Sequence, residues 1–155
     1  MRCPTCKNEK FESATTVLPW AFDGVAVDVT VPCQRCTKCG DEIVAGAHSE
    51  GAERAVAFAL ANEAPVSGAA FRHMRKVLAI SHAEMAAFIA VDPATVTRWE
   101  NGERAPDRAA WELVATIVSE VGLTNADSTT LKRLRARAEP VSTPGLIRRS
   151  VELVA

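Results

Sequence analysis

The chain has 155 residues, of which 48% are hydrophobic and 24% charged, a profile that is typical of a globular protein and excludes disorder throughout. No apolar run approaches the roughly 18 residues that span a bilayer, and the N-terminus lacks the apolar core of a signal peptide, so we expect a cytoplasmic protein with no membrane partner. A formal net charge of −1, from 18 basic and 19 acidic side chains, argues against a polybasic nucleic-acid binder, although it does not show how the charge is distributed.

Cysteine positions, composition and charge predict four parts along the chain, at residues 1–63, 64–68, 69–122 and 123–155. All five cysteines lie before residue 40. Residues 64–68 interrupt an alanine-rich helical stretch with Pro, Ser and Gly, which predicts a linker. The formal charge is −3 for residues 1–63, −1 for 64–122 and +3 for 123–155, so the overall balance combines an acidic N-terminal part with a basic C-terminal part.

Two Cys-x-x-Cys pairs predict a metal site in the first part. In each pair, the two intervening residues let a tight turn point both sulfurs at one ion, and two such turns complete the tetrahedron of a structural zinc. We therefore expect one structural Zn²⁺, and since four thiolates leave no open position, catalytic zinc is disfavoured. Iron would use the same thiolates, whereas a redox pair lacks the surrounding βαβ pattern. The predicted ligands are Cys3, Cys6, Cys36 and Cys39.

Two other residues compete for this metal. Cys33 and Cys36 also form a Cys-x-x-Cys pair, but we favour Cys36 with Cys39, because Gly40 follows them and supplies the positive φ that such a turn often needs. Cys33 is then a free thiol at a strand end. His48 is an alternative to one cysteine, although a lone histidine at an exposed helix start is the interpretation we favour.

The segment between the two pairs is predicted to form a β-hairpin, followed by a helix over residues 49–62. Asp23-Gly24 is a strong two-residue turn sequence between two runs of alternating apolar residues. Pro19 places its strand at a sheet edge, because proline has no N–H to donate. The two runs are Leu18, Trp20 and Phe22 before the turn, and Val25, Val27, Val29 and Val31 after it.

A helix-turn-helix is predicted within residues 69–122. Ser81-His82-Ala83-Glu84 is a capping box that opens a short helix ending at Ile89. After the turn of residues 90–92, Asp92 as N-cap and Pro93 at the first position predict a recognition helix over 93–101. Further helices are expected over 71–78 and 108–121. Two short helices joined by a three-residue turn are typical of DNA-binding proteins.

Helical spacing assigns two faces to the predicted recognition helix. Val96 and Trp99, with Val91 before them, face the core. The opposite face enters the major groove when such a domain docks, and there Arg98 is the candidate for a bidentate contact with guanine. Thr95 and Thr97 are candidates for phosphate or base contacts, whereas Ala94 offers only a methyl group.

Residues 80–106, from Ile80-Ser81-His82 through Arg98-Trp99-Glu100-Asn101-Gly102 to Ala105-Pro106, closely resemble the Xre/Cro-type repressor domain. Together with the preceding Cys-x-x-Cys pairs, residues 1 to about 122 resemble the MqsA-type antitoxins, which carry a YgiT-type zinc finger. This resemblance implies an α+β fold: a small zinc ribbon with a hairpin and one helix, then an all-α, five-helix-type helix-turn-helix domain. It also implies a homodimer on a palindromic DNA operator, and a zinc domain that neutralises an mRNA-cleaving toxin protein.

The resemblance also assigns roles to individual residues. The four cysteines become zinc ligands and Arg98 a base-contacting residue, while Glu100 pairs with Arg75 in a structural ion pair. His82 stands where the family usually has a glutamine at the start of the second helix, and is therefore a further candidate DNA contact. Pro93 and Ala94 replace polar residues of the family.

The last part of the chain leaves two interpretations open. Residues 128–138 predict a short helix with four basic side chains, followed by breaks at Pro140 and Pro144 and the basic pair Arg148-Arg149. This is either a solvated tail or a phosphate clamp or partner strap that orders on binding.

Two functions compete for the whole chain: an autoregulating antitoxin, and a stand-alone Xre-family regulator without a toxin. No arrangement of Ser, His and Asp or of paired carboxylates predicts an enzyme.

Overall fold

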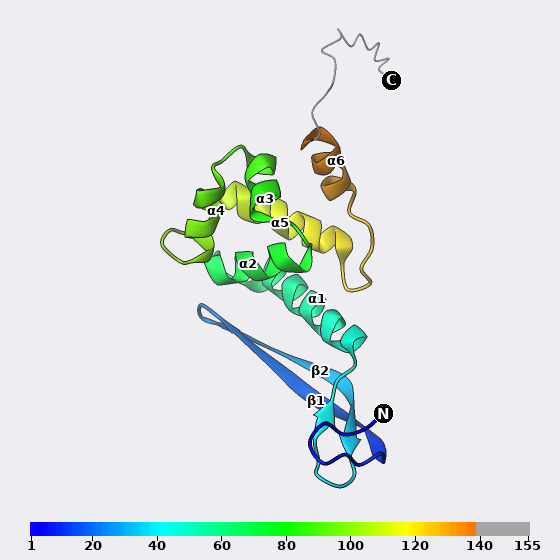
Figure 1. Cartoon of the computed structure of the whole chain (residues 1–155). Helices are drawn as coiled ribbons and strands as arrows, with labels where there is room; N and C mark the ends of the chain where they lie inside the picture. Colours follow the sequence, from blue (N-terminus) through cyan, green and yellow to red (C-terminus); the bar gives the residue numbers. More distant parts are fainter. Residues whose placement is uncertain (139–155) are drawn as a thin grey trace.

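The computed structural model describes residues 1–138 as an α+β fold, which confirms the predicted class. A long hairpin leads down to the two turns that contain the cysteine pairs, and the helices gather above it (Figure 1). Pro140, Pro144 and Arg148-Arg149 lie outside the described residues. Over residues 1–138, the structure holds no helix with the length and apolar character needed to cross a membrane. The elements are β1 (Phe11–Phe22), β2 (Val25–Cys36), β3 (Glu42–Ile43), α1 (Gly46–Glu63), α2 (Gly68–Val77), α3 (His82–Ile89), α4 (Pro93–Glu100), α5 (Arg108–Val121) and α6 (Thr129–Ala138).

The hairpin has the predicted turn at Asp23-Gly24, and its two apolar runs pair with each other. Phe22 pairs with Val25 across the turn, where Gly24 has a φ of +79°, and the ladder runs on until Phe11 lies opposite Cys36. Each strand therefore has 12 residues, more than the apolar runs alone indicate. The reason is that the largely polar segment before Leu18 and the residues after Val31 continue the backbone ladder beyond the alternating apolar runs.

A short strand that the sequence analysis did not predict completes the sheet. β3 has only two residues and pairs with Gln34 and Arg35 of β2, so the strand order is β1-β2-β3. β1 lies at the edge, as Pro19 predicts. Two residues are too few to show the alternation by which strands are recognised in a sequence.

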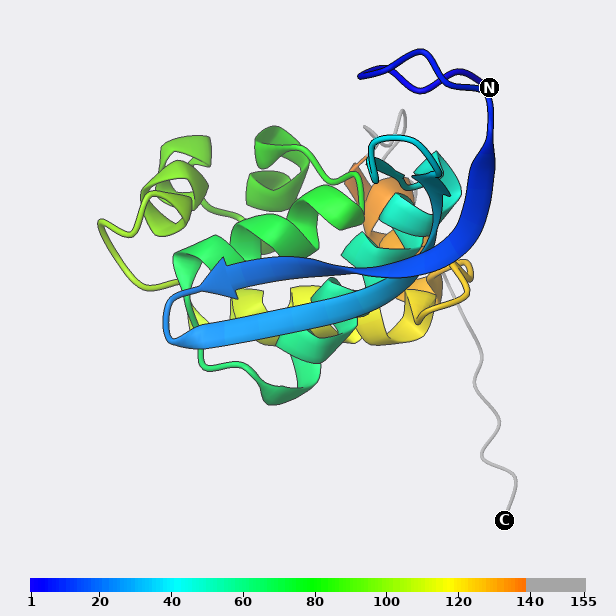
Figure 2. The same cartoon turned by 90° about the horizontal axis from the view of Figure 1, so that it is seen from below.

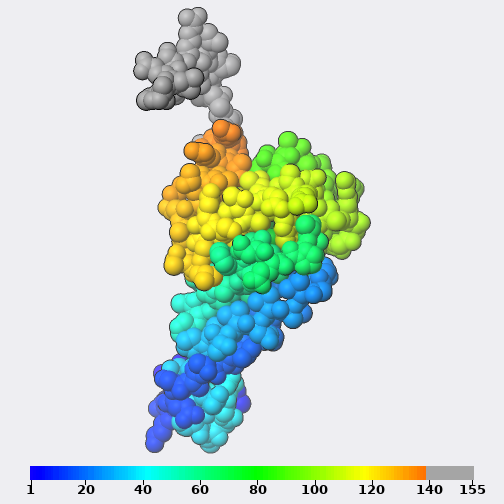
Figure 3. Space-filling model, turned by 180° about the vertical axis from the view of Figure 1, so that it is seen from behind, coloured from blue at the N-terminus to red at the C-terminus, as the bar shows by residue number. Residues whose placement is uncertain are grey.

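The apolar face of the hairpin lies against the helices. Viewed from below, β1 and β2 cross the helical layer (Figure 2), and the view from behind shows them in contact with it (Figure 3). At the tip, the ring of Phe22 meets the ring of His73 on α2 edge-on, with centroids 5.4 Å apart. Half-buried hairpin residues that pack on the helical core are Trp20, Phe22, Val25, Val27 and Val29.

Helix α1 belongs to both parts of the molecule. It begins three residues before the predicted start, because no side chain caps it at Ala45 and the boundary therefore has no capping signal in the sequence. Its residues Val56 and Leu60 are fully buried in the same core as the helices that follow, and α1 also contacts β2. The helix predicted beside the zinc ribbon is thus also a core helix of the helix-turn-helix part.

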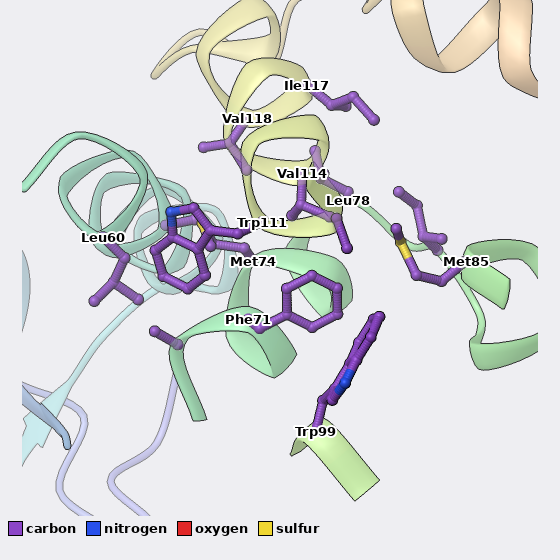
Figure 4. Packing of buried hydrophobic residues seen from close by; sticks show 14 of the residues in the cluster. Leu60, Phe71, Met74, Leu78, Met85, Trp99, Trp111, Val114, Ile117 and Val118 are labelled. Atoms are coloured by element: carbon purple, nitrogen blue, oxygen red, sulfur yellow. The ribbon is translucent and has the colours of Figure 1, made fainter. Parts of the chain in front are cut away.

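Helices α2 to α5 follow the prediction closely, since their capping residues are present. α2 starts at Gly68 instead of Phe71, because the Ser67 hydroxyl accepts a hydrogen bond from the backbone N–H of Ala70 at 3.2 Å and caps the helix earlier. Figure 4 shows how the large side chains of these helices converge. The most deeply buried are Leu60, Phe71, Met74, Ile80, Met85, Val96, Val114 and Ile117.

Candidate metal centre and helix-turn-helix

The four cysteines predicted as metal ligands come together at the base of the hairpin. Their sulfur atoms all lie within 4.8 Å of one another; Cys3 and Cys39 are 3.6 Å apart, and Cys6 and Cys36 are 3.5 Å apart. Sulfurs bound at about 2.3 Å to one tetrahedral ion lie roughly 3.8 Å from each other. The pairing of Phe11 with Cys36 produces this arrangement, because it returns the second turn to the side of the first.

The two turns repeat one backbone design. In the first, the N–H of Lys7 donates to the carbonyl of Cys3 at 3.0 Å; in the second, the N–H of Gly40 donates to the carbonyl of Cys36 at 2.9 Å. Both Lys7 and Gly40 have left-handed backbone conformations, with φ of 61° and 76°. Gly40 adopts this conformation without cost, whereas Lys7 carries a side chain there, which is unfavourable unless the surrounding structure holds it in place.

The chemistry of the thiols fits a cation. Burial raises the pKa of the Cys36 thiol, but hydrogen bonds from the Asn8 amide and from the backbone of Cys39 and Lys38 outweigh it and lower that pKa to about 6. The Asn8 amide nitrogen lies 3.4 Å from the Cys36 sulfur. These donors favour a thiolate at Cys36.

Cys39 shows the opposite effect. A backbone hydrogen bond from Asp41 lowers the pKa of the Cys39 thiol. Three other effects outweigh it and raise that pKa to about 12: the interaction with the Cys6 thiol, which is the largest of them, burial, and the interactions with the Cys3 and Cys36 thiols. Four thiols packed this closely resist ionising together unless a cation compensates their charge. The donor set therefore fits one metal ion with four sulfur ligands.

Polar residues around the four cysteines were not among the predicted site residues. Asn8 donates to a ligand sulfur, and Asp41, in the equivalent place after the second turn, accepts a hydrogen bond from the Thr5 hydroxyl at 2.9 Å. Both follow the second cysteine of their pair by two residues, which is the pattern that would have identified them. Their carbonyls accept from the N–H groups of Cys3 and Cys36 respectively, at 2.9 and 2.8 Å.

Cys33 and His48 lie outside the group of ligands. Cys33 is a buried free thiol, on the same face of β2 as Val31. His48 is exposed in the first turn of α1 and shares a small surface groove with Cys33. Neither belongs to the four-cysteine group.

The second candidate site is the pair of helices α3 and α4. The Ser81 hydroxyl accepts from the N–H of Glu84 at 3.1 Å and the Glu84 carboxylate accepts from the N–H of Ser81 at 2.8 Å, so the predicted capping box is present. Ala90 ends α3 with a left-handed φ of 55°, and the Asp92 carboxylate caps α4 through the N–H of Ala94. These caps define where α3 ends and α4 begins.

Helix α4 has the two predicted faces. Val96 and Trp99 are buried, and the ring of Trp99 meets Phe71 edge-on at a centroid distance of 5.8 Å. On the other side Arg98 is exposed, and its guanidinium makes no ion pair with any of residues 1–138. Of the other predicted contact residues, Ala94 and Thr97 are exposed and Thr95 is half-buried. The Thr97 hydroxyl donates to the carbonyl of Pro93 at 3.3 Å.

A buried charge cluster joins α2, α3 and α4. Arg75 Nε donates to Glu100 Oε1 at 2.5 Å, its second nitrogen donates to Oε2 at 2.9 Å, and a third donates to the carbonyl of Ile80 at 2.6 Å. Only 7% of the Arg75 side chain and 3% of the Glu100 side chain are exposed. The two residues that the resemblance pairs thus form a bidentate ion pair.

His82 is drawn into the same cluster. Its Nε2 lies 2.8 Å from Glu100 Oε2, while 44% of the side chain remains exposed. Burial raises the pKa of Glu100, but the hydrogen bonds and charges of Arg75 and His82 lower it more, so that pKa lies below its usual range. One ring nitrogen of His82 therefore faces the protein, a contact that the sequence pattern did not reveal.

The comparison with known families agrees with this architecture. The family model for the antitoxin component of bacterial toxin-antitoxin systems, MqsA, matches residues 1–124. No curated protein matches the chain. The matched range contains both cysteine turns, the hairpin and helices α1 to α5, and it ends before α6. The chain therefore belongs to the MqsA family of antitoxin components.

Proposed function

We propose that this chain is a zinc-stabilised, sequence-specific DNA-binding repressor that serves as the antitoxin of a type II toxin-antitoxin system. In this proposal it autoregulates its own operon as a homodimer on a palindromic operator and neutralises a toxin protein of the mRNA-cleaving type. The observation that carries the DNA-binding role is Arg98, which is exposed on the outer face of α4 and forms no ion pair within residues 1–138, in a helix-turn-helix whose caps and core are complete.

Zinc is the metal that suits the four-cysteine site. Thiolates are its preferred structural ligands, and Cys3, Cys6, Cys36 and Cys39 would hold it in a closed tetrahedron. When bound, the ion links the two turns and supplies folding free energy to a region with few buried side chains of its own. Asn8 orients the Cys36 thiolate through its amide.

DNA recognition would use a few placed contacts. Arg98 reaches a guanine in the major groove, Thr97 and Thr95 contact a phosphate or a base edge, and Ala94 contributes a methyl contact. His82 uses Nε2 for Glu100, which leaves Nδ1 as the nitrogen that faces a DNA phosphate. The Arg75–Glu100 ion pair fixes α4 against α2 and α3 and makes no base contact itself.

Residues 1–63 are the proposed toxin-binding part. The test is to express the product of the neighbouring gene alone and together with this chain. Growth arrest by that product, relieved by this chain and accompanied by a complex with it, supports the antitoxin role. If the product neither arrests growth nor binds, the stand-alone regulator is the correct function, because DNA binding does not depend on a toxin.

The test of the DNA-binding role is Arg98→Ala. We expect it to weaken binding to a duplex that covers the promoter of the gene for this chain by about 5- to 150-fold, equivalent to about 1–3 kcal/mol, and to reduce the preference over scrambled DNA. Fluorescence anisotropy with both duplexes measures this. Arg2→Ala removes the same side chain at the metal end and should leave binding unchanged. An Arg98→Ala variant that keeps the full preference contradicts the assignment.

A further inference from the structure

Helix α6 lies beyond the part of the chain that the family model matches. The match ends at residue 124, and α6 runs from Thr129 to Ala138. Within its ten residues there are four basic side chains and no acidic one. The basic residues are Lys132, Arg133, Arg135 and Arg137.

The start of α6 is fixed to α5. The Glu120 carboxylate accepts hydrogen bonds from the hydroxyls of Ser128 and Thr130 and from the N–H of Thr130, and these bonds hold the pKa of Glu120 below its usual range. The Ser128 hydroxyl in turn accepts from the N–H of Leu131 at 2.9 Å, which caps the helix. Leu131 and Leu134 pack against the hydrophobic core. The helix predicted in the tail is therefore docked on the fold.

The second half of α6 lies near α3, and Figure 1 shows the two helices on the same side of the molecule. Arg135 Nε donates to Glu84 Oε1 at 3.1 Å, and another of its nitrogens donates to the carbonyl of Ala79 at 3.2 Å. Further along, Arg137 shares a surface groove with Ala87 and Phe88 of α3. α6 is thus anchored to the helix that precedes α4 in the helix-turn-helix.

Two cations on α6 form no ion pair within the part of the chain that the structure describes. Arg135 is engaged with Glu84, and Lys132 with Asp127. Arg133 and Arg137 are both exposed, are four residues apart and so on one face of the helix, and make no ion pair within residues 1–138. Exposed, unpaired guanidinium groups on one face are suited to phosphate oxygens.

The position of α3 gives these cations a partner. When a helix-turn-helix docks with its second helix in the major groove, its first helix crosses the phosphate backbone. We propose that α6, held alongside that first helix, is an additional phosphate-binding element that places Arg133 and Arg137 on the DNA backbone beside the groove read by α4. This inference rests on the proposed DNA-binding function. Its partner is duplex DNA, contacted without regard to sequence.

The test is the salt dependence of DNA binding. In the double variant Arg133→Gln, Arg137→Gln, the slope of log affinity against log salt should become shallower by about 3.6 for the proposed homodimer, since four phosphate contacts are lost and each contributes about 0.9. Affinity should fall by similar factors on the promoter duplex and on scrambled DNA, so the preference between them stays the same. The measurement is fluorescence anisotropy of the full chain between about 50 and 200 mM salt, with a circular dichroism melt to show that the variant is folded.

The matched control is the double variant Lys10→Gln, Lys38→Gln, which removes two positive charges near the four cysteines. This control should leave the slope unchanged. If the wild-type chain binds the promoter duplex and the α6 variant has the wild-type slope and affinity, the inference is wrong. The inference is also wrong if the α6 variant keeps the wild-type slope on DNA but no longer binds a protein partner that the wild-type chain binds. If the wild-type chain binds no duplex, it is the proposed function that fails, so the two failures are distinguishable.

Discussion

Glu100 is the residue on which the helix-turn-helix geometry depends most directly. Its carboxylate holds Arg75 from α2 and His82 from α3 while being itself part of α4. A buried pair of this kind adds little to stability compared with apolar residues of the same size, but removing one partner leaves the other charge buried and uncompensated. The cluster therefore fixes the positions of three helices relative to one another.

Glu100→Gln should lower the free energy of unfolding by about 3–5 kcal/mol, because the buried Arg75 guanidinium loses its counter-charge. Urea denaturation at neutral pH measures this. Glu103→Gln makes the same chemical change on an exposed side chain in the loop after α4 and should be nearly neutral. Equal stability of the two variants would contradict the structural importance of the cluster.

The same pair predicts a pH effect with a definite sign. Because the pKa of Glu100 is lowered on folding, its contribution to stability is complete above the usual glutamate pKa of about 4.3 and is lost as the pH falls through the lowered folded-state value. The free energy of unfolding of the wild-type chain should therefore fall more steeply with acidification in this window than that of Glu100→Gln. Parallel pH profiles would show that Glu100 has the same pKa in the folded and unfolded chain.

At the scale of elements, the close approach of α2 to α4 requires a glycine. A Cβ atom placed on Gly68 would lie 1.8 Å from the carbonyl oxygen of Trp99. No side-chain rearrangement relieves this contact, because the clashing atom belongs to the backbone. The first residue of α2 is thus fixed by the last turn of α4.

Gly68→Ala should destabilise the fold by about 1–3 kcal/mol, since α2 and α4 must separate to admit the methyl group. Gly51→Ala is the matched control within α1, where the nearest atom to a new Cβ is an Arg54 nitrogen at 3.9 Å. There the better helix propensity of alanine should raise stability by about 0.5–1 kcal/mol. Thermal unfolding followed by circular dichroism distinguishes the two, and a shift of the same sign in both variants would disprove the close contact.

The elements that the sequence predicts well are those whose boundaries are set by a capping or turn residue within the element itself. Ser81, Asp92 and Gly24 act through hydrogen bonds or backbone freedom within a few residues, so the start of α3, the start of α4 and the hairpin turn follow from local patterns. The contacts that escaped prediction join distant segments: His82 with Glu100, Asn8 with Cys36, and α6 with α3. Such contacts depend on packing in three dimensions, which short spacing rules do not encode.

For the molecule as a whole, the metal site and the helices share one folded body. The half-buried hairpin residues Trp20, Phe22 and Val27 pack on the helical core, and Val56 and Leu60 of α1 complete that core. Loosening of the hairpin therefore exposes apolar surface of the helices as well.

Removal of the metal with a chelator should accordingly lower the melting temperature of the helices and not only that of the sheet. In the metal-loaded chain we expect a single thermal transition, seen at the same temperature by circular dichroism and by tryptophan fluorescence. Elemental analysis before and after chelation identifies the metal and its stoichiometry, with one zinc per chain expected. Two separate transitions, with the helical one insensitive to chelation, would show that the two parts fold independently.

The shared position of α1 has a consequence for the turnover of this protein. A protease that digests the chain from its N-terminus removes Val56 and Leu60, and with them one wall of the core around Phe71 and Trp111. The remaining helices would then lack part of their packing, so we expect no stable fragment that keeps the proposed DNA-binding surface. Toxin neutralisation and repression, as proposed above, would end together, with one lifetime set by one degradation event.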